Sequence, residues 1–328
     1  MLMRAIFAAL FVMTSPAFAA CEGTNLLDAM AADKRAALES AANSVPYPQG
    51  NFWLAQKDEM EVLLVGTYHL NDPRHEPVVK ALSPRIAAAT TVLVEAGPEE
   101  EQALMAHMAR DPSVMVMPDR SLAELLPPQD WSALSEALSR RGIPAFLAAK
   151  LQPWYVSMML AIPTCDLGDL AEQKGLDGAI IDVAKSYNVP VKGLEPYDTV
   201  FQVFADLPEQ DQLGMIRNSL AMEDRAEDFA TTLADAYFAG RGRLIWEFMR
   251  LETLQMPASS PEVVAAEFAL MEEVIMSARN RNWIAPIEAA ATQGPVVAAF
   301  GALHMSGEDG VAALLAQNGW TLSPQAFP

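Results

Sequence analysis

Four short apolar runs divide the chain, and none of them alternates strictly between polar and apolar positions. They span residues 61–65, 91–94, 189–193 and 296–300. Strands that are apolar throughout are typical of a parallel sheet covered on both faces, where neither face meets water. The pattern therefore predicts four buried parallel strands.

Apolar residues at helical spacing predict helices at residues 76–89, 174–187 and 310–318. The last helix is followed by Gly319, a residue type that commonly ends helices because it adopts a left-handed backbone without strain. Residues 320–322 are expected to form a final strand.

Two long stretches between the strands are helical in pattern and rich in Met, Leu and Ala, at about residues 99–165 and 207–291. Alternating strands and helices with such insertions predict an α/β fold, with a mostly parallel central sheet, flanking helices and a large helical cap. We expect residues 20–328 to be a single, helix-rich domain.

The N-terminus has the layout of a secretory signal peptide, residues 1–19. Arg4 precedes an apolar run over residues 5–13, and small residues follow. The run is shorter than the roughly 18 residues that cross a bilayer, and no later segment is long enough either. We therefore expect a periplasmic or secreted protein with no membrane span in its mature form.

Only two cysteines occur, Cys21 and Cys165. In an exported chain they allow one disulfide, which would fix the mature N-terminus to the domain. Two unrelated thiols are the alternative. Lipidation of Cys21 is less favoured, because Phe18 stands where a lipoprotein signal normally has Leu.

The charge balance excludes several partners. The chain has 22 basic and 42 acidic residues, which gives a formal net charge of −20. A surface this negative repels nucleic acid and anionic lipid heads. Glycine-rich nucleotide-binding motifs and a Gly-x-Ser-x-Gly nucleophile motif are also missing. Nucleic acid, anionic lipid surfaces and nucleotides are therefore not expected partners.

Chemically active residues follow each of the four predicted strands. Two copies of a Gly-x-x-His motif end at His69 and His304, although the chain has only four histidines. Glu95 and Glu195 follow the second and third strands. Because ligands bind at the carboxyl ends of parallel strands, we expect one site there. Taken singly, each residue has an ordinary alternative as a hydrogen-bonded structural histidine or a helix-capping glutamate.

Several segments resemble the TraB/GumN family, which includes the Tiki peptidases and is related to the erythromycin esterase/ChaN-like superfamily. The segments are GTYHLNDPRHEPV, VLVEAGP, VKGLEPYDTVFQVFADLP, RNRNW and AFGALHMSGEDGVAALLAQNGW. They span nearly the whole mature chain, in the family's order. The resemblance implies an α/β fold with its site at the sheet edge.

The Tiki resemblance implies a metal-dependent peptidase in which His69, His304 and Glu95 bind the metal. Two imidazoles and a carboxylate suit Mn²⁺, Co²⁺ or Zn²⁺ and leave a position open for water. Glu195 would then accept the proton, although the two glutamates could exchange roles. The esterase branch implies instead a histidine acting as general base without a metal.

Three further residues are candidates for binding the substrate. Arg279 could stabilise an oxyanion, although it could simply pair with Glu272 or Glu273 on its own helix. Asn280 could orient the substrate. Arg74 could do so at the mouth of the site, although its Asp-Pro neighbours also fit a plain turn.

Eighteen methionines gather mainly in the helical stretches. They are expected to fill the core or to form an adaptable apolar groove, which would suit a peptide or another extended, partly apolar substrate. With the family resemblance, the expected substrate is a peptide or a small molecule. The leading hypothesis is a metal-dependent hydrolase of the cell envelope that cleaves peptides. The alternatives are a non-catalytic binding or regulatory protein and a metal-independent ester hydrolase.

Overall fold

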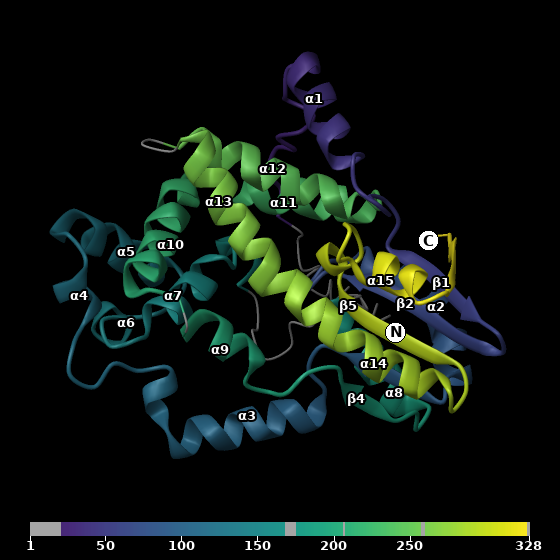
Figure 1. Ribbon diagram of the computed structural model, residues 1–328. Helices are drawn as coiled ribbons and strands as arrows, with labels where there is room; N and C mark the ends of the chain where they lie inside the picture. Colours follow the sequence, from purple (N-terminus) through teal and green to yellow (C-terminus); the bar gives the residue numbers. More distant parts are fainter. Residues whose placement is uncertain (1–20, 168–174, 206, 257–259, 327–328) are drawn as a thin grey trace, which may run out of the picture.

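The computed structural model describes residues 21–167, 175–205, 207–256 and 260–326 (Figure 1). The predicted signal peptide lies outside these described residues. Among the helices of the described ranges, none is both long and apolar enough to cross a membrane.

One sheet forms the centre of the fold, with strand order β4-β3-β5-β2-β1-β6 in the described part of the chain. The strands are β1 (Phe52–Lys57), β2 (Met60–Thr67), β3 (Thr91–Val94), β4 (Val191–Gly193), β5 (Val296–Gly301) and β6 (Thr321–Pro324). Strands β4, β3, β5 and β2 are parallel, whereas β1 pairs antiparallel with β2 and β6. The predicted α/β fold with a mostly parallel sheet is confirmed.

The central strands are buried as predicted, but the edge strand is not. Every residue of β3 and β5 is buried, and so are the last six of β2. In β4, Val191 and Gly193 are half-buried and Lys192 is exposed. The prediction that this strand is covered on both faces is therefore wrong, because β4 lies at the sheet edge with β3 as its neighbour.

Helices cover both faces of the sheet. On one face lie α2 (His75–Ala88) and α8 (Leu176–Ser186), which pack against Leu63 and Val65 of β2. The alternate residues of β2 face α14 (Ala278–Ala291) and α15 (Val311–Gln317) on the other side. Burying each Val, Leu or Ile side chain in these layers contributes about 1.5–3 kcal/mol. The predicted flanking helices are thus confirmed.

A cluster of helices lies beside the sheet (Figure 1). Its elements are α3 (Pro98–Arg110), η1 (Pro112–Val114), α4 (Leu122–Leu125), α5 (Pro128–Arg140), α6 (Ala145–Ala148), α7 (Pro153–Leu160), η2 (Thr164–Asp166), α9 (Thr199–Ala205), α10 (Glu209–Met222) and η3 (Glu223–Arg225). Leu134, Leu138, Leu213 and Ile216 belong to a core of its own. These helices form the cap over the sheet edge.

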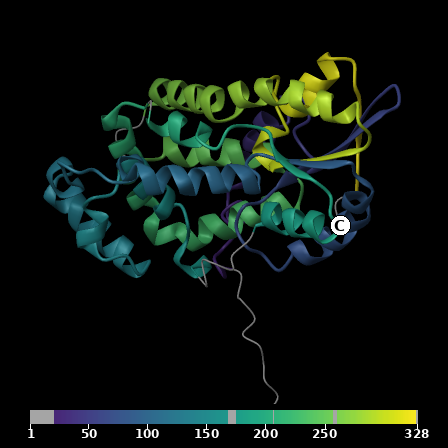
Figure 2. The same cartoon turned by 90° about the horizontal axis from the view of Figure 1, so that it is seen from below.

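A long helix packs against the sheet with its C-terminal part. It consists of α13 (Pro261–Met271), the π-helical segment η4 (Glu272–Ser277) and α14, and Figure 2 shows it in yellow-green along one side of the molecule. The remaining helices are α1 (Ala32–Ala42), α11 (Ala226–Phe238), α12 (Gly242–Leu254) and the short η5 (Ala302–His304). Short π-helical segments occur often at functional sites.

The two cysteines form the predicted disulfide. Cys21 and Cys165 are bonded, with their Cα atoms 5.3 Å apart. The chain after Cys21 runs along α11, where Thr24 N donates to Asp228 at 2.6 Å and Leu26 N donates to Thr232 at 2.8 Å. The start of the domain is therefore fixed to both η2 and α11.

Candidate functional site

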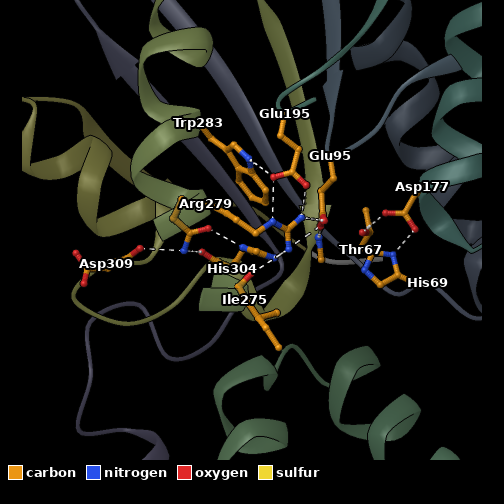
Figure 3. A network of polar contacts seen from close by, with 12 residues as sticks. Thr67, His69, Glu95, Asp177, Glu195, Ile275, Arg279, Trp283, His304 and Asp309 are labelled. Carbon is orange, nitrogen blue, oxygen red and sulfur yellow. Dashed lines mark hydrogen bonds and ion pairs between the residues drawn. The ribbon is translucent and has the colours of Figure 1, made fainter. Parts of the chain in front are cut away.

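The four strand-end residues lie at the same edge of the sheet (Figure 3). Thr67 at the end of β2 is paired with Gly301 at the end of β5, and Val94 of β3 is paired with Gly193 of β4. The chain continues from these strands to His69, His304, Glu95 and Glu195. The parallel register thus brings two imidazoles and two carboxylates together.

Arg279 is at the centre of this cluster. Its Nε and Nη2 donate to the two oxygens of Glu195 at 2.9 and 2.6 Å, and Nη2 also donates to Glu95 at 2.6 Å. Nη1 donates to the carbonyl of Ile275 in η4 at 2.9 Å. Trp283 Nε1 donates to Glu195 at 3.0 Å. A bidentate guanidinium compensates the cost of burying these two carboxylates.

The sequence-based alternative for Arg279 is wrong. Glu272 pairs with Arg243, and Glu273 pairs with Arg281. Neither acid of its own helix is the partner of Arg279, because α14 directs the side chain towards the sheet edge, where Glu95 and Glu195 lie.

His304 is buried, and only 6% of its side chain is exposed. Its Nδ1 lies 2.6 Å from Asn280 Oδ1, while Asn280 Nδ2 donates to the carbonyl of Asp309 at 2.9 Å. This second bond fixes the amide orientation, so His304 Nδ1–H donates and Nε2 faces the cluster, where it lies 3.4 Å from Arg279 Nη1. Burial lowers the pKa of His304 to about 4 despite the neighbouring Glu95 carboxylate. The ring is therefore neutral at pH 7.

His69 has the opposite environment. Its side chain is 61% exposed, and its Nδ1 lies 2.7 Å from the carboxylate of Asp177, which also accepts from the hydroxyl of Thr67. The surrounding protein disfavours the cation, but the charge and hydrogen bond of Asp177, together with Glu95, outweigh this and raise the pKa of His69 to about 9. Asp177 escaped the sequence analysis, because a single aspartate in the first turn of a predicted helix is an ordinary feature.

Gly301 lets His69 and Glu95 approach the end of β5. A Cβ at this position would lie 2.9 Å from His69 Nε2 and 3.3 Å from Glu95 Oε1. Its backbone N–H donates to Glu95 Oε1 at 2.7 Å. Burial opposes ionisation of Glu95, but charge interactions with His304, His69 and Arg279 and this hydrogen bond lower its pKa to about 2. Glu95 is therefore a carboxylate at neutral pH.

Arg74 lies apart from this cluster. Its guanidinium donates to Asp72 at 2.7 Å and to Asp235 at 2.7 Å, and it stacks 4.1 Å from the centre of the Phe238 ring. Arg74 also lines a cavity of about 240 Å³ together with Tyr68 and Leu70, the two neighbours of His69 in the chain. Arg74 thus lies next to the site but does not bind its charged residues.

The donor set suits a divalent metal, although no three His, Cys, Asp or Glu residues of the described chain are arranged around one ion. Each imidazole has its Nδ1 held by Asp177 or Asn280, an arrangement typical of metal-binding histidines. His304 Nε2 lies 3.9 Å from Glu95 Oε1, less than twice a metal–ligand bond of about 2.1 Å. Arg279 supplies the positive charge between the carboxylates in this arrangement.

Comparisons with known proteins agree with the motifs. A profile of the TraB/PrgY/gumN family matches residues 51–324. The chain is also similar to the uncharacterized protein YbaP of Escherichia coli (strain K12) and to that of Shigella flexneri. Each is 22% identical over 253 residues, which cover 77% of this chain and 86% of the relative. The match includes all six strands and every residue of the cluster, and the chain belongs to the TraB/PrgY/gumN family.

Proposed function

We propose that the protein is a metal-dependent hydrolase of the peptidase type that acts in the cell envelope or outside the cell. The observation that supports this most is the arrangement of the two motif histidines. The Nδ1 atom of each ring is held by a hydrogen-bond partner, Asp177 or Asn280. Glu95 lies between the two rings and accepts a hydrogen bond from the backbone N–H of Gly301 (Figure 3). The disulfide between Cys21 and Cys165 supports an oxidising location.

In this proposal His69, Glu95 and His304 hold a Mn²⁺, Co²⁺ or Zn²⁺ ion. The ion would act as a Lewis acid that polarises the scissile carbonyl and activates water. Asp177 and Asn280 orient the two rings, so that each presents Nε2. In this proposal Asn280 therefore orients His304, whereas the sequence analysis expected it to orient the substrate.

Arg279 and Glu195 form the second half of the proposed site. Both oxygens of Glu195 already accept hydrogen bonds from Arg279 or Trp283. Oε2 accepts from both Arg279 and Trp283, so the first role of Glu195 is to hold the guanidinium. Oε1 accepts only from Arg279 and keeps a lone pair that could take a proton. Arg279 so positioned would stabilise negative charge on a carbonyl oxygen through the Nη1–H that now faces His304 Nε2 at 3.4 Å, because its other N–H groups are bonded to Glu95, Glu195 and Ile275. Arg74 remains the candidate that orients substrate in the adjoining cavity.

One observation favours a second candidate, the metal-independent ester hydrolase. His69 and Asp177 form a base–carboxylate pair at 2.7 Å, and the imidazole is open to solvent. A histidine oriented by an aspartate is the usual arrangement of a general base, and because the pKa of His69 is raised to about 9, His69 would act as a base chiefly at alkaline pH. The two candidates use the same His69, so mutation of His69 alone does not separate them.

Metal binding and peptide cleavage test the proposal. The mature protein, purified without chelator, is examined by elemental analysis and titrated with Mn²⁺, Co²⁺ and Zn²⁺ in a calorimeter. We expect one equivalent to bind, with affinity at least about tenfold weaker in His69→Ala. His107→Ala is the matched control, because His107 pairs with Tyr197 in the cap.

The same preparations are incubated with a mixed peptide library. Cleavage by the wild type and not by His304→Ala is the expected result. Absence of stoichiometric metal binding, or equal cleavage by both proteins, contradicts the proposal. Ester hydrolysis that resists chelation would favour the second candidate instead.

A further inference from the structure

A cavity of about 350 Å³ lies within the cap, between α3, η1, α7, α9 and α10. Its walls are partly apolar, with Leu104 of α3, Val114 of η1, Trp154 of α7 and Phe201 of α9. Neither the metal-binding cluster nor the cavity beside Arg74 includes these residues. The cap thus contains a separate cavity large enough for an amino-acid side chain and its peptide group.

The aromatic side chains of this cavity form a rigid corner. The rings of Trp154 and Phe201 meet edge to face with centroids 5.2 Å apart, and Trp154 stacks on Phe204 with centroids 6.0 Å apart. Aromatic pairs with such geometry hold one another in place. A ligand that enters therefore meets a preformed apolar surface.

Two polar groups of buried residues in the cavity wall have no hydrogen-bond partner in the part of the chain that the structure describes. Trp154 is only 4% exposed, and its indole N–H has no hydrogen-bond partner among the described residues. Gln212 is 8% exposed, and its Nε2 donates to the carbonyls of Phe204 and Leu207 at 3.1 and 2.9 Å. The same bonds leave Gln212 Oε1 as a free acceptor within the described chain. Both residues line the cavity.

A free donor and a free acceptor match the two polar groups of a peptide unit. The indole N–H suits a peptide carbonyl, and the Gln212 oxygen suits a peptide N–H. The cavity wall contains neither Lys nor Arg. His107 lines it and lies 3.2 Å from the Tyr197 hydroxyl, and the carboxylate of Asp198 already accepts from Gln202 at 2.7 Å. The chemistry therefore favours an uncharged apolar side chain over an acidic one.

The cavity begins close to the charged cluster. Asp198 lines it and follows Glu195 by three residues, so their Cα atoms are at most about 11 Å apart. Leu104 lies on α3, the helix that follows Glu95 at the end of β3. Along the chain, each of the two glutamates is thus followed by a segment that lines the cavity. An extended peptide of three or four residues would bridge this distance.

We propose that this cavity is a substrate subsite that binds a large apolar side chain and the adjoining peptide group. Trp154 and Gln212 bind the peptide group, and the aromatic corner with Leu104 surrounds the side chain. That the bound ligand is a substrate rests on the proposed peptidase function. Binding itself needs no catalysis and can be measured separately.

Calorimetric titration with N-acetyl-phenylalanine methylamide tests the subsite, with N-acetyl-glycine methylamide as the comparison probe. We expect the phenylalanine probe to bind wild-type protein at least about tenfold more tightly, because it buries an aromatic ring. Leu104→Trp, which fills the cavity, should remove this difference. Met105→Trp is the matched control, since Met105 is the next residue on α3 and is 61% exposed.

Trp154→Phe keeps the aromatic packing and removes the N–H, so it should weaken binding about three- to tenfold. Thermal unfolding verifies that each variant is folded. Equal affinity for the two probes, or unchanged binding by folded Leu104→Trp, overturns the proposal. If the wild type binds the probe selectively but cleaves no peptide, the subsite stands and the hydrolase proposal fails.

Discussion

The two Gly-x-x-His motifs share a pattern and differ in almost everything around it. Both follow neighbouring parallel strands, β2 and β5, whose last residues Thr67 and Gly301 are paired. His69 then lies open to solvent against the carboxylate of Asp177, whereas His304 is buried against the amide of Asn280. The strand and the glycine of the motif determine where each imidazole lies. The residues around the imidazole determine whether it is charged.

The difference shows in the protonation of the two rings. The pKa of His69 is raised to about 9 and that of His304 is lowered to about 4. An anionic partner stabilises an imidazolium, whereas burial beside a neutral amide disfavours it. The same motif thus yields one cation and one neutral ring at neutral pH.

The largest expected effect is on stability and concerns Arg279, which lies next to the buried His304. Arg279→Met removes the cation between Glu95 and Glu195 and leaves two like charges together. We expect a loss of about 3–5 kcal/mol in the free energy of unfolding, measured with urea. Arg281→Met is the control, because Arg281 is 42% exposed and its ion pairs should contribute no more than about 1 kcal/mol. Equal losses would show that burial does not distinguish the two arginines.

The second effect tests whether the two motifs meet. Gly301→Ala adds a methyl group 2.9 Å from His69 Nε2 and 3.3 Å from Glu95 Oε1. Both side chains can move, so we expect stability within about 1 kcal/mol of wild type and peptide cleavage reduced about 100-fold. Gly214→Ala is the control, since its nearest neighbour would be 4.0 Å away. Unchanged cleavage would show that the contact between His69 and Glu95 is unimportant.

The third prediction makes the environment of His304 resemble that of His69. Asn280→Asp places a carboxylate on His304 Nδ1 and should raise the pKa of His304 by about 1–3 units. Titration by NMR of the imidazole protons measures this shift, and the His69 signal is the internal reference. A lower or unchanged His304 pKa would mean that burial, and not its partner, controls the ring.

The smallest effect concerns the exposed pair. Because the folded-state pKa of His69 lies above its ordinary value of 6.5, the stabilisation by Asp177 is complete below about pH 6.5 and is lost as the pH rises through about 9. Wild type should therefore exceed Asp177→Asn in stability by more at pH 6 than at pH 9.5. Solvent screens this exposed ring, so we expect a change below about 1 kcal/mol. A difference that grows with pH would have the wrong sign.

The sequence predicts those parts of the site that depend on strand ends. Residues 91–94 coincide with β3, and the runs before both Gly-x-x-His motifs coincide with β2 and β5. The last residues of parallel strands lie at the same edge of the sheet. The local apolar pattern, which locates the strand ends, therefore also predicts which residues reach that edge. The disulfide could also be predicted, because only two cysteines exist.

Partners from distant helices could not be predicted in the same way. Asp177 resembles any acid in a first helical turn, and Arg279 has two acids on its own helix that the fold assigns to other arginines. Strand β1 escaped detection because its Gln-Lys end is polar and its pairing depends on the hairpin with β2. The cap cavity requires the packing of five elements, which no single pattern contains.

The position of β5 has a consequence for how the protein is made. This strand fills the middle of the sheet between β3 and β2, yet it follows β3 by about two hundred residues in the chain. Until β5 has been synthesised, β3 and β2 lack the strand that pairs with both of them in the sheet. Gly301 and His304 are made together with this strand, so a nascent chain that ends before β5 lacks two residues of the candidate site.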